Sequence, residues 1–205
     1  MKIFSVINNS VYYNKTGDLA LFNTRQPAFL MLPDTVLTTC NRPFFIPDYA
    51  LPCQCSVQVG VRISRLGRCI SQRFAYRYYD AATVAAVFTA RQMLEWLQAG
   101  SLPWSAACCF DGCVAMGRFE ALGPQGVQAL PFMLELDGQA VQSGNMSDLA
   151  SSVDELIAHV SRFVTLRQGD VLLAGALPCS ATDVVPGCRL TARLGGEALL
   201  DFHVK

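Results

Sequence analysis

A two-residue alternation of apolar side chains recurs in several parts of this sequence, and it limits the folds that the chain can adopt. The alternation runs through residues 57–61, 132–136 and 190–204. Successive side chains of a β-strand point to opposite faces of a sheet, so this period is typical of strands with one face against a core. Asp137-Gly138, a dipeptide that favours tight hairpin turns, directly follows the second segment. The pattern therefore predicts a fold rich in β-strands.

Two segments have the spacing of helices. Ser152 and Glu155 form the pattern of a capping box, and apolar residues follow at intervals of three and four. Residues 90–98 form the second predicted helix, with Thr89 as its N-cap. Many strands with two helices, and no regular alternation of strand and helix, predict an α+β fold. Because no linker, repeat or low-complexity stretch divides the chain, we expect one domain over residues 1–205.

The composition is poor in charge. Hydrophobic residues make up 52% and charged residues 16% of the chain, against roughly a quarter charged in typical domains. We therefore expect part of the surface to be covered in an oligomer. The 16 basic and 16 acidic residues give no net charge and form no basic block, which argues against a nucleic-acid partner. No apolar run has the length of a signal peptide or a membrane span, so we expect a cytoplasmic protein without a membrane partner.

The chain contains nine cysteines, an odd number. In a cytoplasmic protein this favours free thiols, most of them small buried hydrophobes, over a disulfide framework. Cys108, Cys109 and Cys113 lie close in sequence, but no Cys-x-x-Cys pair and only two histidines accompany them. We therefore expect neither a zinc site nor a catalytic thiol there, since a nucleophilic cysteine needs a nearby base.

Several short motifs occur in an order that is characteristic of a known family. They lie at residues 56–63, 77–80, 88–91 and 110–112. In this order they resemble the fumarylacetoacetate hydrolase family, in the form of its C-terminal domain and of acylpyruvate hydrolases and 2-hydroxyhepta-2,4-diene-1,7-dioate isomerases. The resemblance extends from Asn41 to Phe202. It implies a mostly β roll with layered mixed sheets, a few outer helices and a dimeric habit.

Members of that family hold magnesium or manganese with a Glu-x-Glu pair on a strand and an Asp just before Phe-Thr-Ala-Arg. The cation acts as a Lewis acid that stabilises an enolate and orients the substrate oxygens. In this sequence the three ligand positions are Ser56, Gln58 and Val87. None of these side chains carries a charge. The resemblance together with these substitutions predicts a protein without a metal cofactor.

The catalytic positions that the resemblance implies are substituted as well. The family's water-activating His and Glu, near the N-terminus, fall on Tyr13 and Thr16, and its lysine falls on Cys108. The turns and core strands match, while every ligand and acid–base group that can be aligned is missing. We therefore expect a catalytically degenerate family member with a binding or assembly role, as a homodimer or as a heteromer with a paralogue.

Two other functions stay open at this stage. One is a metal-dependent hydrolase, isomerase or decarboxylase of small 2-oxo or β-diketo acids, which the family itself suggests. The other is new, metal-free chemistry in the old cleft. For a residual cleft, the residues that we expect near the substituted positions are Arg77, Tyr79, Arg91, Asp111 and Gln142.

Overall fold

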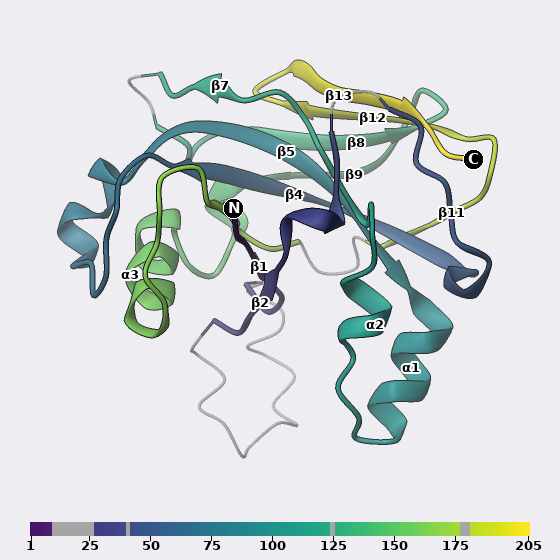
Figure 1. Cartoon of the computed structure of the whole chain (residues 1–205). Coiled ribbons are helices and arrows are strands. Elements are labelled where there is room, and N and C mark those ends of the chain that lie inside the picture. Colours follow the sequence, from purple (N-terminus) through teal and green to yellow (C-terminus); the bar gives the residue numbers. More distant parts are fainter. Residues whose placement is uncertain (10–26, 40–41, 124–125, 177–180) are drawn as a thin grey trace.

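The protein is described by a computed structural model over residues 1–9, 27–39, 42–123, 126–176 and 181–205. In this part of the chain the strands form two sheets (Figure 1). The larger contains β1 (Ile3–Val6), β2 (Phe29–Leu32), β3 (Leu37–Thr39), β4 (Cys53–Ile63), β5 (Tyr79–Ala90), β6 (Val114–Met116), β7 (Glu120–Ala121), β10 (Val171–Leu173) and β11 (Thr182–Val184). The smaller contains β8 (Pro131–Leu136), β9 (Gln139–Asn145), β12 (Arg189–Leu194) and β13 (Glu197–His203).

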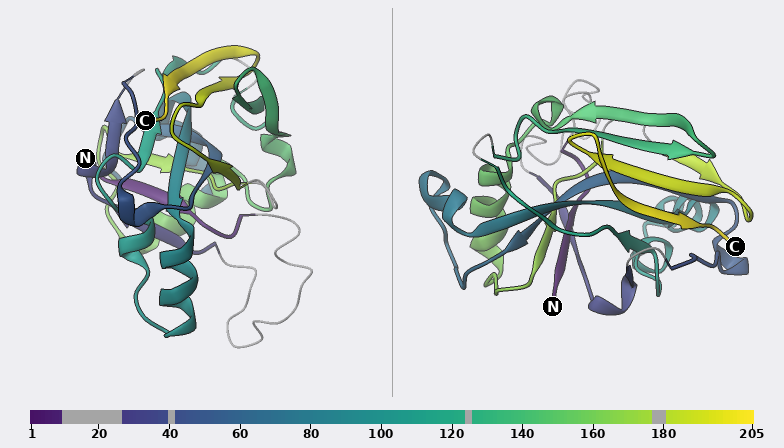
Figure 2. Two further views of the ribbon diagram at one scale, coloured as in Figure 1. Left: turned by 90° about the vertical axis from the view of Figure 1, so that its right-hand side faces the viewer. Right: turned by 90° about the horizontal axis from the view of Figure 1, so that it is seen from above.

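Helices lie mainly on the side of the large sheet that faces away from the small one (Figures 1 and 2). The described α-helices are α1 (Arg91–Ala99), α2 (Ser105–Cys108) and α3 (Val153–Phe163). Short 3₁₀ segments are η1 (Asp34–Val36), η2 (Asp48–Ala50), η3 (Gln72–Arg77) and η4 (Met146–Asp148). The small sheet covers the opposite face of β4 and β5. Figure 2 shows the resulting layers from the side and from above.

The antiparallel pair β4–β5 is the long central element of the large sheet. The strands pair from Cys53 opposite Ala90 to Ile63 opposite Tyr79, which places Ser56 directly opposite Val87. The other edge of β4 is covered in two pieces. β11 pairs with residues 53–55 and β10 pairs with residues 60–62, and between them no described strand pairs with this edge of β4.

The core lies in two places: between the two sheets, and on the face of the large sheet that the helices cover. Phe44 and Phe88 stack with ring centroids 3.8 Å apart, and Phe202 meets Phe88 edge-on at 6.2 Å. All three rings are buried. Burial of such large apolar surfaces is the main favourable term in folding, and offset and edge-to-face rings add to it. The contact joins the large sheet to β13 and fixes the position of the two layers.

The α+β fold predicted from the sequence is confirmed. The alternating segments lie in β4, in β8 and in the β12–β13 hairpin, and the predicted capping box closes the start of α3 through Ser152 and Glu155. The predicted cap of the other helix is wrong. α1 starts after Ala90, which makes no side-chain cap hydrogen bond, because Thr89 still belongs to β5 and pairs with Gln54. No helix of the described ranges is long and apolar enough to cross a bilayer.

Candidate cleft

The structure brings the predicted positions Ser56, Gln58, Val87 and Cys108 together around one hollow of about 270 Å³. Ser56 and Gln58 are two residues apart on β4, so their side chains leave the same face of the sheet. Val87 reaches that face from β5 because it is the cross-strand partner of Ser56. Cys108 comes from the end of α2. Among the described residues, the lining consists of Ser5, Val6, Ile7, Leu30, Leu32, Ser56, Gln58, Val87, Thr89, Leu94, Gln98, Trp104, Cys108 and Ala176.

Gln58 is the polar centre of this cleft. Its side chain is 5% exposed, and its Oε1 accepts a hydrogen bond of 3.3 Å from the hydroxyl of Ser5 on β1. The exposed fraction of Ser5 is 3%. A buried amide and hydroxyl that pair with each other offset part of the cost of leaving water. The arrangement presents neutral hydrogen-bonding groups at the base of the hollow.

The donor set of the cleft does not fit a hard divalent cation. Magnesium and manganese prefer carboxylate oxygens, which supply negative charge as well as lone pairs. Here the three aligned positions offer a hydroxyl, an amide and the methyl groups of Val87. No lining residue among the described ones is charged, and the described residues contain no cluster of three or more His, Cys, Asp or Glu that could hold a metal. The chemistry of these side chains therefore provides no cation site.

The thiol of Cys108 is also poorly suited to catalysis. It is buried and donates to the carbonyl oxygen of Trp104, with a sulfur–oxygen distance of 3.2 Å. Burial raises the pKa of Cys108 to about 11, and the neighbouring Cys109 adds to the rise. The thiol is therefore protonated at neutral pH, whereas nucleophilic attack needs the thiolate. No histidine lines the described part of the cleft to remove the proton.

Gln142 supports the cleft from behind without lining it. This side chain of β9 is 6% exposed and reaches the gap between β10 and β11 on the edge of β4. Its Oε1 accepts from the N–H of Val57, and its Nε2 donates to the carbonyl of Cys55, both at 2.8 Å. A further bond of 3.0 Å runs from Nε2 to the hydroxyl of Thr182. The amide replaces the missing strand and fixes the backbone on both sides of Ser56.

The structure does not place the other expected cleft residues in the hollow. Arg77 is exposed on η3, and Asp111 is exposed in the turn after α2. Tyr79 hydrogen-bonds with Asp154, and burial is the main cause of its raised pKa. Arg91 pairs at the surface with Glu95 and Asp183. The motifs that contain these residues form part of the scaffold. Sequence spacing alone could not show which of their side chains point away from the cleft.

Tyr13 and Thr16, the positions aligned with the family's His and Glu, lie outside the described residues. Trp104, Thr89 and Gln98 line the cleft but were not predicted to do so. Trp104 and Gln98 come from the helical region after β5. No local motif marks them, because only the packing of α1 and α2 against the sheet turns them inward.

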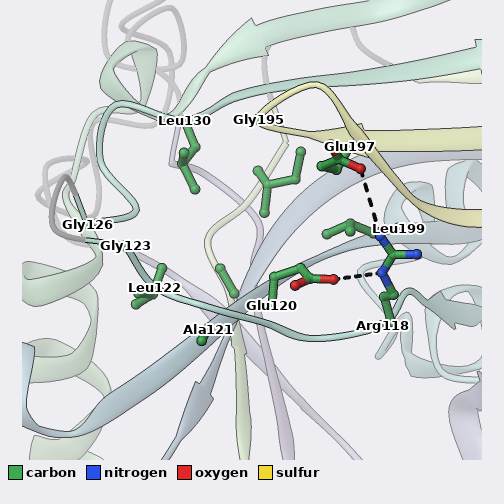
Figure 3. A pocket seen from close by; sticks show the side chains of 12 residues that line it. Arg118, Glu120, Ala121, Leu122, Gly123, Gly126, Leu130, Gly195, Glu197 and Leu199 are labelled. Atoms are coloured by element: carbon green, nitrogen blue, oxygen red, sulfur yellow. Dashed lines mark hydrogen bonds and ion pairs between the residues drawn. The ribbon is translucent and has the colours of Figure 1, made fainter.

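A second hollow is larger but contains none of the predicted positions. It measures about 540 Å³ and lies between β7 and the β12–β13 turn (Figure 3). Arg118 reaches across it, 2.7 Å from Glu120 and 3.9 Å from Glu197. All three side chains are more than half exposed, so these ion pairs are worth little energy. Its one described arginine faces two glutamates, and none of the aligned family positions that the structure describes lines it, so we regard the smaller cleft as the functional site.

Comparison with known proteins shows related sequences and the same fold. The chain is 25% identical over 181 residues to the mitochondrial oxaloacetate tautomerase FAHD1 of Mus musculus, covering 88% of this chain and 81% of that protein. It is 27% identical over 176 residues to the oxaloacetate tautomerase YcgM of Escherichia coli K12, covering 85% and 80%. The crystal structure of fumarylpyruvate hydrolase from Pseudomonas aeruginosa, in complex with Mn²⁺ and pyruvate, has the same fold with a TM-score of 0.88, at 20% identity over 100% of this chain and 89% of that one.

The strongest statement about ancestry comes from the family model. The model of the fumarylacetoacetate hydrolase C-terminal domain matches residues 2–201, nearly the whole chain. The sequence motifs, the two-layered fold and the position of the cleft agree with that match. This chain belongs to the fumarylacetoacetate hydrolase family.

Proposed function

We propose that this protein has kept the family cleft but not the family's metal-assisted chemistry, and that the cleft binds a small neutral ligand. The observation that carries the proposal is the absence of charge among the described residues of its lining, with Ser56, Gln58 and Val87 at the aligned ligand positions. Without a cation, an enolate on the substrate has no electrophile to stabilise it. The role is therefore binding, and not cleavage or tautomerisation of an oxo acid.

The lining also indicates the chemical class of the ligand. Gln58, Ser56 and Thr89 of the strands offer amide and hydroxyl groups, and Leu94 and Trp104 of the helical region offer apolar surface. A carboxylate in this cleft would leave water without gaining a positive partner, which costs several kcal/mol. A neutral compound with one polar and one apolar side, such as an amide or a lactam, meets both kinds of surface.

Metal-dependent conversion of small oxo acids is the second candidate function. Relatives named as oxaloacetate tautomerases and a fold neighbour with bound Mn²⁺ and pyruvate support it. This support comes from the relatives, whereas the donor set of this cleft supports the first candidate. The second candidate requires substrate turnover when metal is added, whereas the first requires that metal has no effect.

One assay separates the two candidates. Purified protein is incubated with enol-oxaloacetate and with an acylpyruvate, with and without millimolar Mg²⁺ or Mn²⁺, and the loss of substrate absorbance is followed. We expect no rate above the protein-free control. A metal-dependent turnover of roughly 1 s⁻¹, ordinary for an enzyme, would overturn the binding proposal and establish the second candidate.

Ligand binding has its own readout. A thermal-shift screen compares neutral amides and lactams with oxalate and pyruvate, each with and without Mn²⁺. We expect neutral compounds alone to raise the melting temperature, because a ligand that binds only the folded state stabilises it by mass action. The Gln58→Leu variant should lose that rise. A shift with oxalate that requires Mn²⁺ contradicts the proposal.

A further inference from the structure

The segment between β4 and β5, residues 64–78, displays a concentration of arginines. We call it the arginine loop; it ends with η3. Arg65, Arg68, Arg73 and Arg77 lie within it, all exposed, and the loop contains no Asp or Glu. The whole chain has no net charge. The loop therefore forms a local positive surface, while the rest of the chain carries the compensating negative charge, and such a surface favours a negatively charged partner.

These four arginines differ from most others in the described part of the chain. Outside the loop, among the described residues, five arginines pair with carboxylates, and Arg42, Arg162 and Arg167 do not; the pairs are Arg62 with Asp80, Arg91 with Glu95, Arg118 with Glu120, Arg189 with Asp201 and Arg193 with Glu135. No arginine of the loop forms an ion pair with a described residue. Apart from one bond from Arg77 to the hydroxyl of Tyr76, their guanidinium N–H groups have no hydrogen-bond partner among the described residues and can bind a carboxylate from outside the chain.

The backbone of the loop is held firmly although its arginines are exposed. Ile70 is buried, and its N–H donates to the hydroxyl of Ser161 on α3 at 2.9 Å. The N–H of Cys69 donates to the carbonyl of Ser161, also at 2.9 Å. Gly67 and Leu166 exchange backbone hydrogen bonds of 3.0 and 2.8 Å. A surface ordered in advance loses less conformational entropy when a partner binds.

Aromatic rings beside the arginines orient the guanidinium groups. The guanidinium of Arg73 lies 4.4 Å from the ring centroid of Phe74, and that of Arg77 lies 5.1 Å from Phe74 and 5.4 Å from Tyr76. Arg77 also donates to the hydroxyl of Tyr76 at 3.0 Å. Phe74 is 38% and Tyr76 55% exposed. Arginine with tyrosine and phenylalanine is the composition that carries most binding energy at protein interfaces.

The neighbouring part of α3 extends this surface. A hollow of about 310 Å³ between the loop and α3 is lined by Arg162 and His159 together with Gln72 of the loop. Glu155 is the one acidic residue of its described lining. That carboxylate accepts from the N–H of Ser152 at 2.8 Å in the cap of α3. The capping role holds this carboxylate at the helix start, where it forms no ion pair with an arginine of the described residues.

We propose that the arginine loop docks an acidic segment of a partner protein. Arginine binds carboxylates through two parallel N–H groups, whereas electrostatic binding to lipid or nucleic-acid surfaces relies on total positive charge. The exposed rings of Phe74 and Tyr76 offer apolar contact between the charges. The surface lies on the β4–β5 connection beside α3 (Figure 1). None of its residues lines the described part of the cleft, so this proposal does not depend on the function of the cleft.

Fluorescence anisotropy tests the proposal with a labelled peptide of glutamates interspersed with tryptophan. We expect saturable binding by the parent. The Arg73→Glu, Arg77→Glu variant should bind at least about tenfold more weakly, equal to about 1.4 kcal/mol. Arg73→Lys, Arg77→Lys keeps the charge but removes the planar fork, and it should bind with intermediate affinity. Circular dichroism of each variant verifies the fold.

The matched control is Arg42→Glu, Arg167→Glu. These arginines are exposed outside the loop and form no ion pair with a described residue, so the control changes the net charge by the same amount. It should bind the peptide like the parent. If the control loses as much peptide affinity as the loop variant, the proposal is overturned, because the change in total charge alone then explains the weaker binding. Absent peptide binding also overturns it, as does preferential binding to phosphatidylserine vesicles or single-stranded RNA.

Discussion

Gln142 hydrogen-bonds with Val57 across the two sheets: the side-chain Oε1 accepts from the backbone N–H at 2.8 Å. The same amide donates to the carbonyl of Cys55. One side chain thus satisfies both backbone groups that flank Ser56, on the edge of β4 that no strand of the described segments covers at this place. Buried backbone groups need such partners, so the shape of the cleft depends on a residue that does not line it.

Gln142→Leu should therefore destabilise the protein. The variant keeps much of the volume but leaves two buried backbone groups of β4 unpaired, at about 1–3 kcal/mol each. We expect the free energy of unfolding in urea to fall by roughly 2–4 kcal/mol. Gln139→Leu, at an exposed position of the same strand, is the control and should change it by less than about 0.5 kcal/mol. Equal stability of parent and Gln142→Leu would show that the bonds contribute nothing.

Carboxylates restored at the aligned positions should create a cation site. In the variant Ser56→Glu, Gln58→Glu, Val87→Asp, three negative charges face one hollow and repel one another, so the metal-free protein should melt below the parent. Millimolar Mn²⁺ should raise its melting temperature by linkage and leave the parent unchanged. Ser56→Gln, Val87→Asn is the neutral control. Identical melting curves with and without Mn²⁺ would mean that these positions do not form the family's metal site.

The purified parent should contain no stoichiometric magnesium, manganese or zinc. The reason is the neutral donor set of the described cleft. Elemental analysis after dialysis measures the content directly. One metal ion per chain contradicts this expectation and would point to the enzymatic candidate.

Thiol ionisation should make the stability fall at alkaline pH. Burial raises the pKa of Cys53 and Cys108 to about 11 and that of Cys113 to about 12, from an ordinary value of 9.0. The thiols of the unfolded chain therefore lose their protons at lower pH than those of the folded protein. The free energy of unfolding is unaffected by these thiols below about pH 9, and it declines between about pH 9 and pH 12 as the pH rises towards the pKa values of the folded state. Urea unfolding at several pH values measures the slope. Cys113→Ala should lower that slope by up to about 1.4 kcal/mol per pH unit.

Cys108 should resist alkylation in the native protein. Its thiol is buried and protonated, whereas Cys69 is exposed on the arginine loop. Iodoacetamide near pH 8 followed by peptide mass spectrometry should modify Cys69 first and leave Cys108 unmodified until the protein is denatured. Rapid modification of Cys108 would indicate an activated thiol and favour new chemistry in the cleft.

The local features of this fold could be predicted from the sequence. The period-two alternation located β4, β8 and the β12–β13 hairpin, because the side-chain direction of a strand is set by its own backbone. Ser152 and Glu155 marked the start of α3 because a capping box involves only neighbouring residues. The motif order also identified positions 56, 58 and 87 correctly as neighbours in space, since two lie on one strand and the third lies in the adjacent motif.

Other features were decided by packing between distant segments. The family resemblance placed Gln142 near position 56, but no local pattern showed that its amide bonds to the backbone of β4, more than eighty residues away. The resemblance also placed Arg77 and Arg91 near the cleft, although both lie at the surface. Thr89 was predicted to cap a helix but remains in β5, because pairing with β4 extends the strand past it. A side chain's partners across layers depend on how two sheets stack, and this information is not contained in any local pattern of the chain.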